Sequence, residues 1–586
     1  MTSPSDSMAY ATRTASSVLS LCALVGASVL ACLAWLSPNH YLPWPSFHSE
    51  LPMACAGLLL AVWALSQRRE QALRAPWLFV LAVATSALPW AQWLAGTVFF
   101  VGEAWVSSLY LVALALGVLV GHRIVVLYGP TRAFEGLAGV VLLGAVVSTW
   151  IALNQWLELK HFQWTALGLE PGSRYYANFA QPNHFALLLV LGIVCTGLLY
   201  VRGRIGAVGG GLLLVLLSLG IAMSASRAAY LELGAVSAWL FFARTRLPAG
   251  QRDRLSPATL LIASLLVIAA ALTWPALRDA WNPPPPEGAG VDHSLLRAGD
   301  TRRSHWLVLL DAATRRPWSG YGWYQTNSAQ LEAAASHPAT YQTLAQSHNQ
   351  FLDLIVWVGL PLGLLLGGAL IVWFAQVMRK VRGAEGVLAV AFVGAAFAHS
   401  LVEFPLYYAY FLIPVALAMG GLSATITSNA TIRLQRHLVY VLVAATAILT
   451  SLVSLEYFRI EEYWRALRFE HANIGAKRVS NNQPDIYINT GLREFLRLGS
   501  QPPVLPVSDE ETLQIGKLAM RYPHAFYLTL YAAALADRGH GTQASAVLAS
   551  VCKVHGAGLC RASKEQWSQY AATRPNVSRL AWPDSD

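Results

Sequence analysis

Charged residues are scarce in this chain. Only 12% of its 586 residues are Asp, Glu, Lys or Arg, and 55% are hydrophobic, whereas a typical soluble domain has about 25% charged residues. This composition excludes an ordinary soluble protein. The formal net charge of +10 would point to nucleic acid in a soluble protein. Here most basic residues lie in short loops between apolar runs, so we interpret them as a signal of membrane topology.

Cysteine is scarce too, with six residues, and no cysteine spacing resembles a zinc site. Two of the six, Cys552 and Cys560, lie close together in a polar C-terminal region. If that region is outside the cytoplasm, the compartment permits a disulfide between them. The other four lie in apolar runs, where a buried thiol behaves as a small hydrophobic group. They are Cys22, Cys32, Cys55 and Cys195.

The apolar runs predict an all-α integral membrane protein with thirteen transmembrane helices, in a range of 12–14, since each helix needs about 20 apolar residues. The first run is longer than the apolar core of a cleaved signal peptide, and we expect it to be retained. The thirteen runs lie near 17–36, 51–66, 76–92, 104–121, 134–153, 185–201, 205–222, 229–243, 258–276, 351–375, 386–400, 405–424 and 438–456.

Lysine and arginine are distributed unevenly between the loops. Segments 37–50, 93–103 and 401–404 contain neither, whereas the alternate loops are basic. Because cytoplasmic loops carry the excess of Lys and Arg, we predict a cytoplasmic N-terminus and an external C-terminal region. The basic loop residues are Arg68, Arg69, Arg74, Arg123, Arg132, Arg202, Arg204, Arg244, Arg246, Arg252, Arg254, Arg379, Lys380, Arg382, Arg433 and Arg436.

The chain is predicted to divide into a membrane domain, 1–456, and a soluble helical domain, 457–586. The membrane domain has two long external loops, near 154–184 and 277–350, and loops of this length are usually functional or disordered. In the soluble domain, YAAALADRGHGTQASAVL within 522–551 has helical spacing on both sides of a glycine-containing turn. This pattern predicts a helical hairpin of the tetratricopeptide kind.

Polar residues on the predicted external side are candidates for a functional site. Arg174 and Arg227 break the charge rule for that side. Arg227 could be a snorkelling residue at a helix end, but arginine is also well suited to phosphate oxygens. Gln181, Asn183 and His184 flank a proline just before a long apolar helix, where they either cap that helix or line a site.

Three further external clusters combine basic, acidic and proton-accepting groups. Arg302 and Arg303 lie in the long loop, which ends in His348 and Asn349 just before the next apolar run. A histidine at such a position can accept a proton near neutral pH. Glu403 lies between two closely spaced runs, and ionisable groups at membrane depth are functional candidates. Together the clusters predict a site for a phosphorylated donor and a base.

Several ordered motifs resemble the O-antigen ligase and polymerase superfamily, from about residue 39 to about 560. Within that superfamily, the chain most resembles the bacterial protein O-oligosaccharyltransferases, which glycosylate pilins and other periplasmic proteins. The motifs are NHYLPWPSFHSE at 39–50, QPNH at 181–184, SASR at 224–227, RRSHW at 302–306, GYGW at 320–323, SHNQFLDLIVWVGLP at 347–361 and HSLVEFPLYYAYFL at 399–412. The tail matches only loosely.

The resemblance implies a GT-C-like glycosyltransferase in the bacterial inner membrane, with a periplasmic active site. It implies transfer of an oligosaccharide from undecaprenyl pyrophosphate to Ser or Thr of a protein, with inversion, without a metal ion and without a cofactor. Arg227, Arg302, its alternate Arg303, and Arg174 would bind the pyrophosphate. His348 would act as the general base or hold the pyrophosphate, with Asn349 beside it. Glu403 and His399 would orient the acceptor or His348, and Gln181, Asn183 and His184 would shape the site.

Other functions remain open from the sequence. An O-antigen ligase would transfer the glycan to lipid A-core, but such ligases usually lack so large a soluble tail. An O-antigen polymerase shares the same chemistry, although the QPNH and HSLVEFPL elements weigh against it. A transporter for lipid-linked sugars would show internal repeats and polar groups near mid-membrane. The sequence has no such repeat, and its polar clusters lie toward one side.

Overall fold

The structure of the protein is a computed structural model and describes residues 4–67, 72–159, 166–169, 173–281, 297–426, 431–475, 483–500, 505–506 and 508–583. These residues are mostly helical, apart from strands β1 (Leu73–Pro76) and β2 (Thr431–Leu434). The α-helices are α1 (Pro4–Leu36), α2 (Phe47–Ser66), α3 (Trp77–Thr85), α4 (Leu88–Leu94), α5 (Val101–Leu157), α6 (Pro182–Val201), α7 (Ala207–Ser224), α8 (Arg227–Ala243), α9 (Ala249–Arg254), α10 (Pro257–Trp281), α11 (Arg297–Arg315), α12 (Thr326–Ala334), α13 (Gln350–Val358), α14 (Leu360–Lys380), α15 (Gly383–His399), α16 (Ala409–Thr425), α17 (Arg436–His471), α18 (Thr490–Gly499), α19 (Asp509–Arg521), α20 (Ala525–Asp537), α21 (Gly541–Val554), α22 (Ala557–Thr573) and α23 (Pro575–Ser578). Short 3₁₀ helices occupy Arg244–Arg246 (η2) and Pro405–Tyr407 (η3).

In the described part of the chain, nine helices are long and apolar enough to cross a membrane. This confirms the prediction of an all-α, multi-pass integral membrane protein. α5 contains two of the predicted runs, since its 57 residues are interrupted at Gly129, whose φ of 80° is not helical. Glycine adopts such a φ readily, and Pro130 after it suits the start of a new helix. The count of thirteen spans and the GT-C-like architecture stay predictions.

The chain divides into two compact units. Unit 1 comprises Met1–Thr85, Leu109–Val291 and Val372–Ser451, and unit 2 comprises Ser86–Ser108, Asp292–Ile371 and Leu452–Asp586. These two units divide the chain in another way than the predicted membrane domain, 1–456, and soluble domain, 457–586. The boundary expected between 456 and 457 falls within α17. That domain division stays a prediction.

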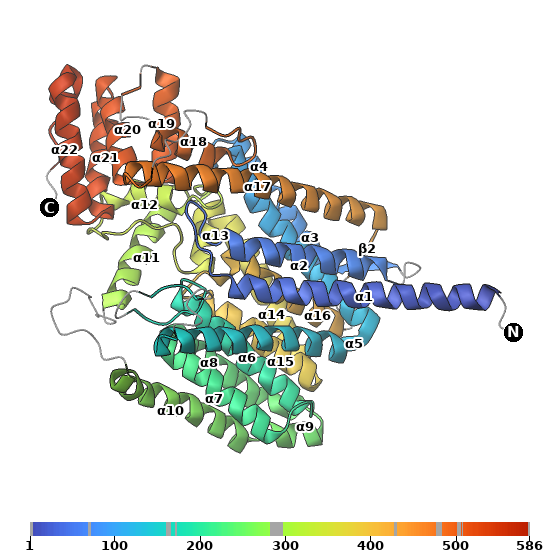
Figure 1. Cartoon of the computed structure of the whole chain (residues 1–586). Helices are drawn as coiled ribbons and strands as arrows, with labels where there is room; N and C mark the ends of the chain where they lie inside the picture. Colours follow the sequence, from blue (N-terminus) through green and yellow to red (C-terminus); the bar gives the residue numbers. More distant parts are fainter. Residues whose placement is uncertain are drawn as a thin grey trace. The chain divides into compact units, whose positions relative to one another are not determined.

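In unit 1, neighbouring helices pack as an apolar bundle. α1 packs against α2, α6 against α7, and α15 against both α6 and α8 (Figure 1). Ion pairs join neighbouring helices of this bundle. At the end of α6, Arg202 Nε lies 3.3 Å from Oε1 of both Glu135 and Glu385. Two predicted cytoplasmic loops also contact each other, since β1 and β2 pair antiparallel with Arg74 opposite Arg433. That pairing requires both loops to be on one side of the membrane.

In unit 2, the long loop predicted near 277–350 is partly helical, since it contains α11 and α12. Its run of prolines at 283–286 lies outside the described residues. The apolar run near 351–375, predicted as one span, is instead two helices, α13 and α14. The reason is local: Gly359 has a φ of 82°, and its backbone therefore cannot continue α13.

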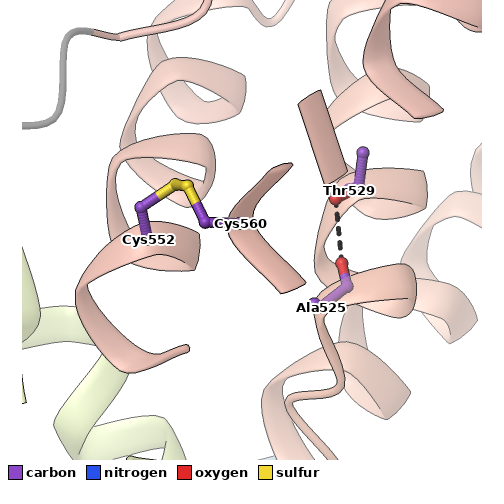
Figure 2. The surroundings of a disulfide bond; sticks show 4 residues. All are labelled: Ala525, Thr529, Cys552 and Cys560. Carbon is purple, nitrogen blue, oxygen red and sulfur yellow. Dashed lines mark hydrogen bonds between the residues drawn. A yellow bond between two sulfur atoms is a disulfide. The ribbon is translucent and has the colours of Figure 1, made fainter. Parts of the chain in front are cut away.

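The tail in unit 2 forms a helical layer. The hairpin expected within 522–551 is present as α20 and α21, and α20 also packs against α19 and α22. Its apolar interior includes Leu528, Leu548 and Trp567. Cys552 in α21 and Cys560 in α22 form a disulfide with Cα atoms 5.0 Å apart (Figure 2). The bond joins consecutive helices across a short turn.

Replacing both disulfide cysteines with serine should loosen α21 and α22. Closing so short a loop stabilises the folded state by roughly 2–3 kcal/mol in the chain-entropy description. We expect faster amide hydrogen exchange in these two helices of the full chain. Cys22→Ser, which removes an exposed free thiol of α1, is the control. Unchanged exchange in α21 and α22 would contradict the stabilising role.

The tail should also lose stability in mild acid. Burial lowers the pKa of His524 and of His555, whose Nε2 lies 2.8 Å from the carbonyl oxygen of Pro523. The folded tail therefore takes up protons on these rings only at a lower pH than the unfolded chain, in which histidines have the ordinary pKa of about 6.5. The contribution of these two neutral rings to the stability of the tail is therefore fully present above that pH and decreases as the pH falls below it.

Hydrogen exchange of α20 and α21 at pH 7.5 and pH 5.5 measures this effect. We expect faster exchange at pH 5.5 in the wild type and a smaller difference in the His524→Gln, His555→Gln variant. An equal pH response in both proteins would show that other groups govern it.

Candidate functional site

The turn before α6 is built around Gln181. Its side-chain Oε1 accepts hydrogen bonds from the backbone N–H groups of Asn183 (2.5 Å) and His184 (3.1 Å), and Pro182 occupies the first helical position. This is an N-terminal helix cap, as proline and amide side chains favour. Ala180 just before it has a φ of 54°, which residues other than glycine rarely adopt. The cap directs Asn183 and His184 toward neighbouring segments.

Asn183 joins three segments that are far apart in the sequence. Its Nδ2 donates a hydrogen bond to Glu403 Oε1 at 2.7 Å. Its Oδ1 accepts hydrogen bonds from Ser226 Oγ at 2.8 Å and from Arg174 Nη2 at 3.2 Å. The loop before α6, the start of α8 and the turn after α15 therefore meet at one side chain.

Glu403 lies in a tight turn after α15 and is only 1% exposed. Its backbone N–H donates to the carbonyl oxygen of His399 at 2.8 Å. His399 in turn lies with Nδ1 2.5 Å from Glu232 Oε1, and both of these side chains are fully buried. His399 of α15 and Glu232 of α8 therefore form a buried pair next to the Glu403 turn.

His184 contacts aromatic side chains that follow Glu403 in the sequence. Its Nδ1 lies 3.1 Å from the hydroxyl oxygen of Tyr410, and its ring centroid lies 4.7 Å from that of Tyr408. The carbonyl oxygen of Tyr410 accepts a hydrogen bond from Trp35 Nε1 at 2.9 Å. The QPNH turn and the start of α16 are therefore packed together.

Sequence reasoning missed two buried carboxylates of unit 1, Glu232 and Glu50. Glu50 in the first turn of α2 accepts a hydrogen bond from Ser46 Oγ at 2.5 Å and from the Ala409 backbone N–H at 3.3 Å. Tyr110 also donates its hydroxyl to Glu50. Glu232 interrupts strongly apolar sequence, and Glu50 directly precedes an apolar run. An acidic residue within or beside an apolar run is the signal that could have found them.

Arg227 is the first residue of α8, and its side chain is exposed. It has no ion pair and no side-chain hydrogen bond to any described residue. Ala225, two residues earlier, has a φ of 48°, so the chain turns sharply into this helix. The N-terminal end of a helix already carries partial positive charge. An arginine there makes the position favourable for an anion such as phosphate.

In unit 2, His348 lies in a turn that two helices hold in place. Asn349 caps α13 by accepting from the backbone N–H groups two and three residues later, at 3.0 and 3.1 Å. Ser347 donates its N–H to Asp353 Oδ1 at 2.8 Å, and its carbonyl oxygen accepts from Trp306 Nε1 of α11 at 2.8 Å. His348 itself is half-buried with a φ of 59°. A strained backbone of this kind is common at functional sites.

α11 presents one face toward this turn. Arg302, His305 and Trp306 are spaced at three and four residues, so they share a face of the helix. Arg302 is half-buried, whereas Arg303 is exposed. His305 is buried, and burial together with the nearby His348 lowers the pKa of His305 to about 4. His305 is therefore neutral near pH 7.

Each unit gathers part of the predicted site. Unit 1 holds Arg174, Gln181, Asn183, His184, Arg227, His399 and Glu403, and unit 2 holds Arg302, Arg303, His348 and Asn349. The hydrogen bonds of Asn183 link Arg174 and Glu403, and the backbone N–H of Glu403 donates to the carbonyl oxygen of His399. In unit 2, His348 and α11 are linked through Ser347 and Trp306.

Two family models match the chain. The model described as O-Antigen ligase matches residues 212–367, which include Arg227, Arg302 and His348. The model described as the C-terminal part of a virulence factor membrane-bound polymerase matches residues 387–574, which include His399, Glu403 and most of the tail.

Two curated relatives from Acinetobacter baylyi are similar to the chain. One is a general O-oligosaccharyltransferase, 29% identical over 545 residues, which cover 90% of this chain and 91% of the relative. The other is a ComP-specific O-oligosaccharyltransferase, 25% identical over 338 residues, which cover 58% of this chain and 60% of the relative.

The helical fold and these similarities define a multi-pass membrane glycosyltransferase of the O-oligosaccharyltransferase class. The chain resembles the O-antigen ligases and polymerases over residues 212–367 and 387–574, and an O-oligosaccharyltransferase over 90% of its length.

Proposed function

We propose that this chain transfers an oligosaccharide as one block from undecaprenyl pyrophosphate to Ser or Thr hydroxyl groups of pilins or other periplasmic proteins. The observation that carries the proposal is the similarity to a general O-oligosaccharyltransferase over 90% of the chain. The acceptor oxygen attacks C1 of the first sugar, the bond from C1 to the pyrophosphate oxygen breaks, and the configuration at C1 inverts. Undecaprenyl pyrophosphate leaves.

Arginine side chains are proposed to stabilise the leaving pyrophosphate without a metal ion. Arg227 is exposed at the positive end of α8, where an anion is favoured. Arg302 shares a helix face with residues that hold the His348 turn, which favours it over the exposed Arg303. Arg174 donates to Asn183 and extends the positive charge of unit 1. Fixed cations of this kind stabilise charge that develops in a transition state.

His348 is proposed to take the proton of the acceptor hydroxyl as general base. Its half-buried position and the fixed turn around it suit that role. Should the acceptor need no strong base, His348 instead binds the pyrophosphate, with Asn349 shaping the turn. Glu403 and His399 orient the acceptor or His348, and Gln181, Asn183 and His184 shape the site.

The proposed location is the bacterial inner membrane, with the N-terminus in the cytoplasm and the reaction in the periplasm. Within unit 1, the Gln181 cap and the Glu403 turn lie at helix ends opposite to the Arg202 ion pairs. The candidate residues and these basic loop residues therefore lie at opposite helix ends, which supports placing them on opposite sides of the membrane. The Cys552–Cys560 disulfide supports an oxidising compartment for the tail, which we propose helps to receive the acceptor protein.

Expression in a host cell tests the proposal. The host makes an undecaprenyl-pyrophosphate-linked glycan but lacks a ligase and a protein oligosaccharyltransferase of its own, and it exports a pilin-like acceptor. We expect the acceptor mass to increase by one whole glycan at a Ser or Thr. An unmodified acceptor, despite a correctly inserted chain and a confirmed donor pool, would contradict protein glycosylation.

The match of residues 212–367 to the O-antigen ligase model favours one second candidate, transfer to lipid A-core. In the same host, that activity would put glycan on lipopolysaccharide and leave the protein unmodified. An elongated lipid-linked glycan with neither acceptor modified would instead indicate a polymerase, as the match at 387–574 allows.

A further inference from the structure

We propose that Glu232 is a positioning residue for the transfer reaction. Acting through His399, it holds the turn that carries Glu403 in a fixed place relative to the start of α8. The inference rests on the proposed function, because it gives Glu232 a part in the same site. None of the sequence motifs contains Glu232.

The first support is the geometry of the pair. Glu232 is the one acidic residue of α8 and is 0% exposed, and His399, the last residue of α15, is 0% exposed as well. Their Oε1 and Nδ1 atoms are 2.5 Å apart. Arg227 begins α8 five residues before Glu232, and Glu403 follows four residues after His399. The pair therefore joins the two segments that present a candidate cation and a candidate carboxylate.

The second support is a parallel link between the same two segments. Asn183 bonds to Glu403 at 2.7 Å and to Ser226, the residue before Arg227, at 2.8 Å. The Asn183 link joins Ser226, just before α8, to Glu403, whereas the other link joins Glu232, in the second turn of α8, to the last residue of α15. Two separate links between segments fix both the rotation and the translation of one relative to the other, which a single link does not.

The third support is the expected cost of burying this pair. Burying ionisable groups inside a membrane protein is costly, and an apolar pair of similar volume is often as stable or more stable. Glu232 Oε2 and His399 Nε2 are also buried without a hydrogen-bond partner among the described residues. Groups that serve only structure are usually fully hydrogen-bonded. We infer that the pair is kept for the placement of Glu403.

Three variants test this role in the purified full-length protein. Glu232→Met with His399→Leu removes both partners, so neither polar group is left alone. Glu232→Gln keeps an oxygen that can accept from His399 Nδ1–H. Glu385→Gln is the matched control, because Glu385 is a carboxylate of the same α15 that accepts from Thr131 at 2.7 Å and pairs with Arg202 far from the Glu403 turn.

We expect the double variant to keep the melting temperature of the wild type while kcat of glycan transfer falls by about 10²-fold, since small displacements of reacting groups cost about that much. KM for the donor should change little. Glu232→Gln should restore most of the rate, and the Glu385→Gln control should match the wild type in kcat.

Three outcomes would overturn the inference. They are a wild-type kcat in the double variant, a fall in melting temperature that accounts for the lost rate, and a Glu232→Gln enzyme as slow as the double variant. A wild-type enzyme that transfers no glycan to any acceptor is distinct, because it contradicts the proposed function itself.

Discussion

His348→Ala is expected to lower kcat for glycan transfer by about 10²–10⁴-fold, the usual contribution of a general base. The turn around His348 is held by Ser347, Asn349 and Trp306 through backbone and side-chain hydrogen bonds that do not involve the imidazole. The variant should therefore fold normally. Turnover on a defined donor and acceptor, with KM measured for each, is the readout.

A matched control is available in the same unit. His337 is also partly buried and lies with Nε2 2.9 Å from Asp311 Oδ2, outside the candidate site. His337→Ala should transfer glycan at close to the wild-type rate. If His348→Ala raised only KM for the donor and left kcat unchanged, His348 would bind pyrophosphate and would not be the base.

Arg302→Ala should lower kcat/KM for the donor by about 10²–10³-fold, the loss typical of a removed group that stabilises transition-state charge. Arg303→Ala should have little effect. The two arginines are neighbours in sequence, yet Arg302 is half-buried and lies three and four residues before His305 and Trp306, whereas Arg303 is exposed. Arg302→Lys should recover part of the activity, because lysine keeps the charge but not the paired donors of arginine.

Kinetics with a series of donor concentrations decide between the two residues. Equal losses in Arg302→Ala and Arg303→Ala would mean that general positive charge on α11 matters rather than one placed side chain. A loss confined to Arg303→Ala would assign the role to that residue and contradict the proposed role of Arg302.

Much of the fold could be predicted, because its signals are local. Each predicted apolar run is helical, although the runs near 76–92 and 351–375 are each divided into two helices. The tail hairpin follows from helical spacing around a turn. The break at Gly359 could not be predicted, since a glycine within an apolar run is also compatible with a continuous span. α11 was missed because its amphipathic sequence is not apolar enough to be read as a span and lies beside a proline-rich segment.

The sequence offers candidate residues for the site, but it does not reveal the contacts between them. Gln181 as a helix cap follows from its place before Pro182, and the cap is present. That Asn183 bonds at once to Arg174, Ser226 and Glu403 depends on the packing of distant helices, which spacing alone does not encode. Glu232 carried a usable signal, a lone carboxylate in an apolar helix, but its partner His399 lies 167 residues away.

Transfer by the purified protein from a defined donor tests the central claim most directly. The enzyme in detergent would receive undecaprenyl-pyrophosphate-linked oligosaccharide, with a pilin-like protein and lipid A-core offered separately and together, and His348→Ala as the control. We expect glycan on Ser or Thr of the protein, release of undecaprenyl pyrophosphate, and a rate lower by about 10²–10⁴-fold with the variant. Glycan found on lipid A-core alone would contradict protein glycosylation and make the chain a ligase.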